Sequence, residues 1–269
     1  MSETTSLLEL DFPETWNIST TPDKAYMVYK CTNLRSIKNL AALRSATTFP
    51  DGSFRYLSNL ESIDLSPLTS LTEISSAFLG DCYRLKSLKF VPNKNLIQIK
   101  LSFLVNAISL TSLDLSEYTI TGEGLVAAAS PLGASFLKGC SNLKSLKLPT
   151  IAEGKKVGSA FLSGCSSLTE LDLTPVENAA IGSGTSAGIM TNGFQNCDNL
   201  TKIKTGKLST GNFNVSKQNY IDSYFTTTNP DAKCYTQGIT IEGENQAAIV
   251  AQFADLTTGP YRKLVEAQS

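Results

Sequence analysis

The chain has 269 residues, of which 41% are hydrophobic and 17% are charged, and its formal net charge is −1. This composition is that of an ordinary globular protein, and the near-neutral charge argues against a nucleic acid or an anionic membrane as the partner, because both need a basic surface. No apolar run approaches the roughly 20 residues of a membrane-spanning helix, so we expect no membrane insertion.

Residues 1–26 come before the first copy of an internal repeat. Their apolar residues lie among acidic residues, threonines and serines; they are Leu7, Leu8, Leu10, Phe12, Trp16 and Ile18. We predict an N-terminal cap, because the first coil of a repeat stack exposes its inner face, and we expect Trp16 to pack within it. The segment does not have the basic start and apolar core of a signal peptide, so the protein is either cytoplasmic or has lost its leader.

From residue 27 to residue 205, a unit built on L-x-x-L-x-L repeats seven times. Its leading leucines are Leu34, Leu60, Leu85, Leu110, Leu143, Leu168 and Leu200, which are 26, 25, 25, 33, 25 and 32 residues apart. A unit that recurs at such a spacing packs on its neighbours, so the pattern predicts a solenoid of seven coils. Within each complete copy, apolar and polar residues alternate, which indicates a strand with one buried face.

Two further positions recur ahead of each strand. An apolar anchor comes first, at Met27, Phe54, Phe78, Phe103, Phe136, Phe161 and Phe194. A small residue follows, at Cys31, Ser58, Cys82, Ala107, Cys140, Cys165 and Cys197. Because this slot accepts Cys, Ser or Ala, we predict a buried column of small side chains with reduced thiols. Cys140 and Cys165 lie in adjacent coils, but stacked parallel positions seldom have disulfide geometry.

The pattern resembles the BspA-like leucine-rich repeat, also called the bacterial type 5 repeat. The clearest copy has Ala160, Phe161 and Cys165 ahead of the core from Leu168 to Leu173. The resemblance implies a leucine-rich-repeat solenoid, which we expect to be right-handed, with a parallel sheet on the concave face and mostly loops or short turns on the convex side. It also implies an exported or cell-surface protein of host-associated bacteria or protists, with adhesion or protein binding proposed for a few members. It offers no catalytic residues to transfer.

Two coils are about 8 residues longer than their neighbours, and the extra residues lie between strand and anchor. These inserts are residues 116–135 and 174–193, both rich in glycine and alanine. We expect them to form loops on one side of the solenoid, where they are candidates for ligand binding. Gly182 and Gly184 lack the Lys-Ser/Thr pair of a phosphate-binding loop.

After Thr205 the repeat fades, and we read residues 206–269 as a C-terminal cap. Residues 238–242 read as a final strand. Asn245 then looks like the N-cap of a helix over residues 246–256, which Gly259 and Pro260 end.

The residues offer little support for catalysis. The chain contains no histidine, which removes Ser-His-Asp and Cys-His nucleophiles and the usual general base at neutral pH. There is no C-x-x-C pair, so we expect no metal site, and no motif points to a cofactor. Cys234 is the one cysteine outside the repeat slot. We therefore expect a protein that is not an enzyme.

The outward position in the middle of each strand alternates in charge without exception. In chain order it is Lys38, Asp64, Lys89, Asp114, Lys147, Asp172 and Lys204. Strands of a parallel sheet lie roughly 4.8 Å apart, so these side chains are predicted to form one continuous row of opposite neighbours. Two interpretations stay open: an ionic ladder that keeps the coils in register, or a polar recognition strip whose seven residues bind a ligand.

These observations favour a non-enzymatic protein-binding or adhesion module at the cell surface, with a protein or another host-surface ligand as partner. The alternative is a scaffold or spacer domain of a larger surface protein with no ligand of its own. The outward columns that flank the charged row contain no aromatic residue, so we expect a ligand at the inserts, the rims or the caps before the sheet face. The sequence identifies neither the ligand nor the oligomeric state.

Overall fold

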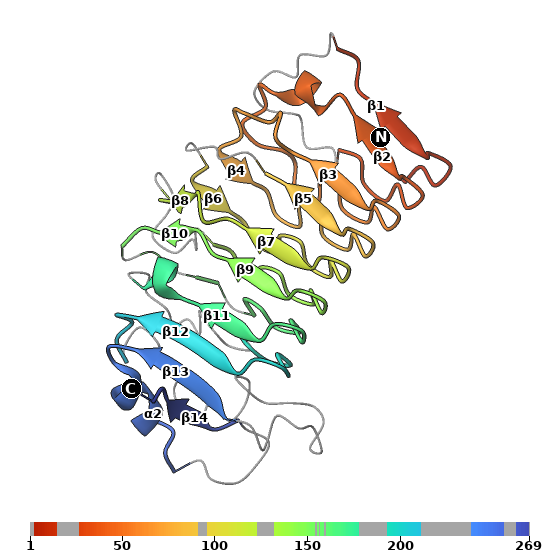
Figure 1. Cartoon of the computed structure of the whole chain (residues 1–269). Coiled ribbons are helices and arrows are strands. Elements are labelled where there is room, and N and C mark those ends of the chain that lie inside the picture. Colours follow the sequence, from red (N-terminus) through yellow and green to blue (C-terminus); the bar gives the residue numbers. More distant parts are fainter. Residues whose placement is uncertain are drawn as a thin grey trace.

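The computed structural model describes residues 3–14, 27–90, 96–122, 132–153, 155, 157–158, 160–177, 193–210, 238–255 and 262–268. The chain winds into a stack of coils, and each coil adds one short strand to a front sheet (Figure 1). The front strands are β1 (Glu9–Asp11), β2 (Ser36–Lys38), β3 (Ser62–Asp64), β5 (Ser87–Lys89), β7 (Ser112–Asp114), β9 (Ser145–Lys147), β11 (Glu170–Asp172), β12 (Lys202–Gly206), β13 (Ile239–Gly243) and β14 (Leu264–Glu266). The predicted repeat solenoid with parallel strands is confirmed.

Equivalent residues of neighbouring repeats lie opposite each other. In the β3–β5 pair, Ile63 aligns with Leu88 and Asp64 aligns with Lys89, and the β7–β9 pair has the same register. The hydrogen-bonded ladders are nevertheless interrupted: they join β1 to β2, β3 to β5, β7 to β9, and β11 through β14. The front sheet is therefore a series of paired strands that lie side by side.

A second line of short strands runs beside the front sheet. It contains β4 (Glu73–Ile74) with β6 (Gln98–Ile99), and β8 (Thr119–Ile120) with β10 (Thr150–Ile151). Single parallel bridges from Ile99 to Leu132 and from Leu132 to Val157 extend the first pair. We expected mostly loops and turns away from the front sheet, but the structure has this second set of paired strands there. The strands pair because stacked coils bring their backbone N–H and C=O groups opposite one another. Two short 3₁₀ helices, η1 (Leu40–Leu43) and η2 (Thr174–Val176), follow β2 and β11.

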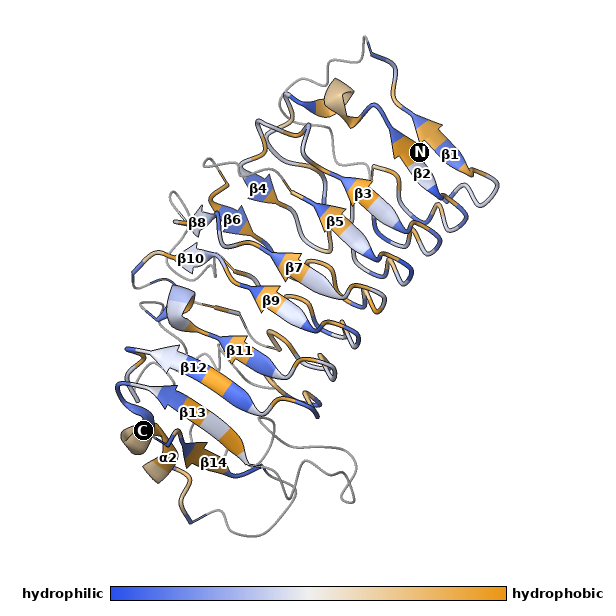
Figure 2. Ribbon diagram, in the orientation of Figure 1, coloured by the Kyte–Doolittle hydropathy of each residue, from blue (hydrophilic) through white to orange (hydrophobic). Residues whose placement is uncertain are grey.

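The core is a set of columns that run along the stack. All seven leading leucines are fully buried, and so are the phenylalanine anchors. The Phe136 ring stacks on Phe103 at 5.8 Å and on Phe161 at 5.2 Å between centroids. Burial of each such Leu or Phe side chain contributes roughly 1.5–3 kcal/mol, so the columns supply most of the cohesion between coils. Figure 2 shows the corresponding alternation of apolar and polar residues along the front strands.

The turn that leads to each strand has an unusual backbone. In the second to fifth coils, the residues one, three and five positions before the slot have positive φ. In the third coil these are Ala77, Leu79 and Asp81, at 55°, 55° and 56°. Later coils place Gly139 and Gly164 at the last of these positions, with φ of 78° and 82°. The left-handed conformation costs an L-residue roughly 1–2 kcal/mol, which explains why glycine is used there.

In the second coil, the assignment of Ser58 to the small-residue slot is wrong. The Leu60 N–H donates to the Leu57 carbonyl, as the Leu85 N–H does to the Cys82 carbonyl. Leu57 is fully buried, whereas Ser58 is partly exposed. The slot lies three residues before the leading leucine in every coil, and it therefore accepts a leucine as well as small residues.

The described C-terminal residues hold the predicted strand, as β13, and an α-helix, α2 (Gln246–Ala251), that is shorter than predicted. The Asn245 side chain does not cap this helix. Its amide instead donates to the carbonyls of Lys207 and Leu208 at 3.3 and 3.1 Å, which ties the start of α2 to the preceding coil. β14 was not predicted. The division into a repeat region and two caps at residues 26 and 205 stays a prediction; β1 pairs with β2 across the first boundary.

Candidate functional site

The charged row on the front sheet is present in part. Asp64 Oδ2 lies 3.0 Å from Lys89 Nζ, and Asp114 Oδ2 lies 2.8 Å from Lys147 Nζ. Asp172 is opposite Lys204 in the β11–β12 ladder. These contacts confirm that the alignment columns are columns in space.

The row also extends one strand further at each end than the sequence suggested. Asp11 of β1 lies opposite Lys38, and Glu242 of β13 lies opposite Lys204, so the alternation of sign continues over both. Sequence reasoning missed these two acids because their segments lack the leucine pattern that defines a copy. In the predicted strand over 238–242 the signal was Glu242 directly after Ile241, whereas no strand was predicted over Glu9–Asp11.

The row is not continuous, which corrects the prediction of seven linked charges. Among the described residues, no ion pair joins Lys38 to Asp64, Lys89 to Asp114 or Lys147 to Asp172. Lys38 Nζ contacts Glu9 Oε1 at 2.7 Å instead. These three gaps fall where neighbouring strands belong to different hydrogen-bonded ladders, whereas Asp172 and Lys204 share a ladder and also have no ion pair among the described residues.

The three aspartates have a second role that the charge pattern hid. Each accepts the backbone N–H of the residue two positions later, with distances of 2.8 Å at Ser66, 3.0 Å at Ser116 and 2.9 Å at Thr174. This is an Asx turn, and it shapes the exit from the strand. The Ser66 side chain is the largest cause of the lowered pKa of Asp64, with a smaller contribution from the Ser66 backbone N–H, and Lys147 followed by Ser116 lowers the pKa of Asp114 to about 2. Asp64 and Asp114 are therefore held by their own coil and the next, and Asp172 is held by its own coil.

Aromatic and basic residues gather instead along the turns that precede the front strands. We call this surface the tyrosine edge and define it as Tyr29, Arg55, Tyr56, Tyr83 and Arg84. The Tyr29 and Tyr56 rings meet edge to face at 5.6 Å, and the Arg55 guanidinium lies 4.6 Å from the centroid of Tyr56. Tyr83 is 39% exposed.

A buried acid supports this edge. Asp81 accepts hydrogen bonds from Arg55 Nε at 2.9 Å and from Asn106 Nδ2 at 2.8 Å, and it is 4% exposed. Burial, followed by the Asp81 carboxylate, raises the pKa of Tyr83, so the phenol keeps its proton at neutral pH. Three consecutive coils are thus linked through one carboxylate.

A hollow of about 340 Å³ lies beside the edge, lined by Arg35, Asn59, Glu61 and Arg84. Arg84 Nη2 contacts Glu61 Oε1 at 2.7 Å, and Lys86 Nζ contacts Glu61 Oε2 at 2.9 Å. Lys86 and then Arg84 lower the pKa of Glu61, which stays ionised. A second hollow of about 270 Å³ on the sheet face lies between β9 and β11, where Lys144, Lys204, Glu170 and Asp172 surround two leucines.

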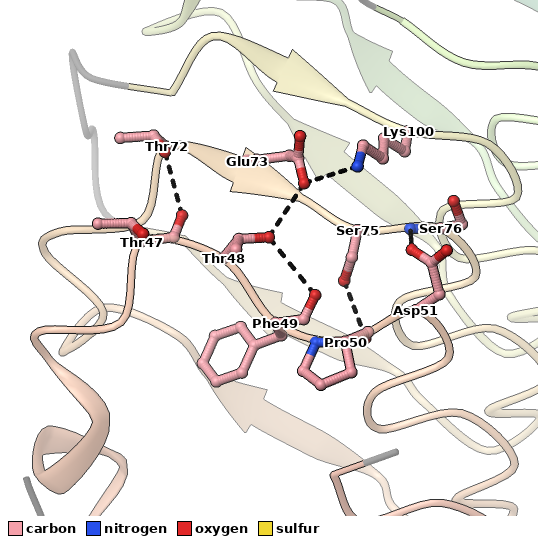
Figure 3. Close-up of polar contacts among 10 residues, drawn as sticks. All are labelled: Thr47, Thr48, Phe49, Pro50, Asp51, Thr72, Glu73, Ser75, Ser76 and Lys100. Atoms are coloured by element: carbon pink, nitrogen blue, oxygen red, sulfur yellow. Dashed lines mark hydrogen bonds and ion pairs between the residues drawn. The ribbon is translucent and has the colours of Figure 1, made fainter. Parts of the chain in front are cut away.

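Polar contacts on the second line of strands link coils to one another (Figure 3). Glu73 Oε1 accepts from Thr48 Oγ1 at 3.0 Å and pairs with Lys100 Nζ at 2.8 Å. Ser75 Oγ donates to the Pro50 carbonyl at 3.2 Å. Each contact joins one coil to the next, so this network stabilises the stacking of the coils.

The described cysteines form the expected internal column. All five are free and buried. Four of them direct the thiol at a carbonyl of the preceding coil: Cys82 to Phe54 at 3.2 Å, Cys140 to Leu104 at 3.2 Å, Cys165 to Leu137 at 3.3 Å and Cys197 to Leu162 at 3.2 Å. Burial raises the pKa of Cys82, Cys140 and Cys197 to about 12, so these thiols do not serve as nucleophiles at neutral pH.

Other predicted features lie outside the described residues: Trp16, Cys234 and most of both inserts, at residues 123–131 and 178–192. Within the described part of the chain, no group of acidic or cysteine side chains could hold a metal ion. No described helix is long and apolar enough to cross a membrane.

The repeat is similar to one known from other proteins. The family model described as the BspA type leucine rich repeat region matches six copies over residues 2–124 and 128–225. A crystal structure of a leucine-rich repeat protein from Bacteroides ovatus is 18% identical and covers 73% of this chain, with a TM-score of 0.30. The match spans 60% of that protein's chain. No curated protein sequence matches.

Proposed function

Because the chain belongs to the family of BspA type leucine-rich repeat proteins, we propose that it is a non-enzymatic protein-binding module, and that it acts at the cell surface in adhesion. The surface location rests on the resemblance to exported members of the family. The ligand is a protein or another component of a host surface.

The tyrosine edge carries the proposal. Tyrosine and arginine are the residues that, with tryptophan, dominate binding energy at protein interfaces. Here three tyrosines and two arginines from three consecutive coils lie in contact or adjacent in sequence on one rim. The outward positions of β3, β5, β7 and β9 are serines and charged residues, with no aromatic residue or arginine among them.

The absence of histidine and the burial of the described thiols support a function without catalysis. Pairs of a serine or cysteine nucleophile with a histidine base are therefore excluded.

A scaffold or spacer without a ligand is the second candidate. It is favoured by the front face, where Asp64 and Asp114 are paired with lysines of the next strand and with their own turns. A saturated face of this kind offers a partner few free hydrogen-bonding groups.

A pull-down against host matrix proteins and immobilised glycans separates the two candidates. The protein is compared with a Tyr83→Ala/Arg84→Ala variant and with variants that lack residues 123–131 or 180–190. The first deletion stops short of Ile120 and Leu132 because both are buried. We expect capture by the wild type and both deletions and loss in the Tyr83/Arg84 variant. Capture of nothing by the wild type would favour the spacer, and loss only in a deletion would move the site to that insert.

A further inference from the structure

We propose that the tyrosine edge and the hollow beside it bind an extended acidic polypeptide segment, in which a carboxylate side chain neighbours an apolar or aromatic one. The inference rests on the proposed protein-binding function and specifies the chemistry of its partner.

The hollow carries an excess of positive charge. Arg35 and Arg84 line it with only Glu61 as a counter-charge, and Glu61 also pairs with Lys86. Among the described residues, no carboxylate lies within ion-pair distance of Arg35. This local excess contrasts with the net charge of −1 of the whole chain. A carboxylate from a partner would supply Arg35 with a charge-assisted hydrogen bond.

Exposed apolar side chains lie directly beside this charge. Tyr83 and Ile108 are 39% and 40% exposed and occupy the same position in consecutive coils, each directly after the slot residue. Arg55 adds no net charge here, because Asp81 pairs with it at 2.8 Å. The rim is therefore neutral and apolar on one side of Arg84 and cationic on the other, which matches a partner with both kinds of side chain in sequence.

The same arrangement favours a polypeptide over a nucleic acid or a sulfated glycan. A polyanion binds best to an unbroken run of cations, because each neutralised charge releases a counterion. Here Glu61 interrupts the run, and Tyr83 and Ile108 offer no charge to a polyanion. A single carboxylate needs only Arg35, because Glu61 is already engaged by Arg84 and Lys86.

The site is also held in place before a partner arrives. Glu61 fixes Arg84 and Lys86, and Asp81 fixes Arg55 with support from Asn106. Fixed side chains lose less conformational entropy on binding, so a weakly complementary segment still binds measurably.

The probe is a short fluorescein-labelled Gly/Ser peptide that carries two Asp-Phe pairs, and binding is measured by fluorescence anisotropy. The controls are the same peptide with Asn for Asp, and the Lys263→Glu variant, which reverses an exposed charge in a distant coil. We expect saturable binding to the wild type and to Lys263→Glu. Arg35→Glu and Arg84→Glu should each weaken it by about tenfold or more, and Tyr83→Ala/Ile108→Ala by about fivefold or more.

Arg35→Glu keeps the test valid if Arg84→Glu misfolds, because no described ion pair involves Arg35. No saturable binding by the wild type, or equal affinity of Arg35→Glu and Lys263→Glu, would overturn the proposal. So would heparin that binds tighter than the peptide with the same dependence on Arg35. A wild type that captures a partner in the pull-down but ignores the acidic peptide refutes this inference alone; failure in both assays refutes the binding function as well.

Discussion

Replacing Asp114 separates the two tasks that the front-sheet aspartates perform. Asp114→Asn removes the ion pair with Lys147 but keeps the oxygen that accepts the Ser116 N–H. Both partners of the pair are more than half exposed, so its loss should cost roughly 0.2–1 kcal/mol. Asp114→Ala also removes the turn contact and should cost a further ~0.5–1.5 kcal/mol. Asp114→Lys, which places like charges opposite, should lower stability by up to ~1–2 kcal/mol.

Urea unfolding of the single variants and of Asp114→Asn/Lys147→Gln measures the coupling between the two residues. The pH dependence gives a second check. Lys147 and Ser116 lower the pKa of Asp114 from 3.8 to about 2. A lowered folded-state pKa means that the stabilisation is present above pH 3.8 and disappears as the pH falls towards 2. Zero coupling at low salt, or a difference between wild type and Asp114→Asn that is as large at pH 2 as at pH 7, would refute the pairing.

Three further predictions concern the packing of the coils. Gly158→Ala should destabilise the fold by roughly 1–3 kcal/mol in urea, because its Cβ would overlap the backbone nitrogen of Ala134; a fully stable variant would contradict the close contact. Asp81→Ala should cost roughly 1–3 kcal/mol by leaving the Arg55 and Asn106 donors without their acceptor, and an unchanged midpoint would show that the edge does not depend on this acid. Cys82 and Cys140 should resist alkylation at pH 8 in the folded protein, as read by peptide mapping, since burial raises the pKa of each to about 12; rapid labelling without denaturant would refute the closed column.

The sequence was informative about the stack because its period is a spatial period. Each coil repeats the same inward positions, so the leucine and cysteine columns could be predicted from the spacing of the copies alone. Leu57 was missed because the second coil has one residue fewer between anchor and slot than its neighbour, and counting from Phe54 rather than from Leu60 shifted the assignment. A backbone hydrogen bond fixes the number of residues between the slot and the leading leucine, so counting from that leucine identifies the slot correctly.

The breaks between ladders and the tyrosine edge could not be predicted by aligning the repeats. Whether adjacent strands form a ladder depends on backbone placement, which side-chain letters do not report, so the breaks after β2, β5 and β9 were not foreseen. The tyrosine edge was missed for a different reason. Tyr29, Tyr56 and Tyr83 occupy three different positions relative to the slot, so they fall in no common column although they share one rim. The available signal was the concentration of tyrosines in the turns of the first three coils.

Hydrogen–deuterium exchange on the complex with the partner captured in the pull-down tests the binding account most directly. We predict slowed exchange in the turns around Tyr29, Tyr56 and Tyr83 and unchanged exchange in β5, β7 and β9. Protection confined to those front strands, or no partner to protect any surface, would contradict the assignment of the tyrosine edge as the binding site.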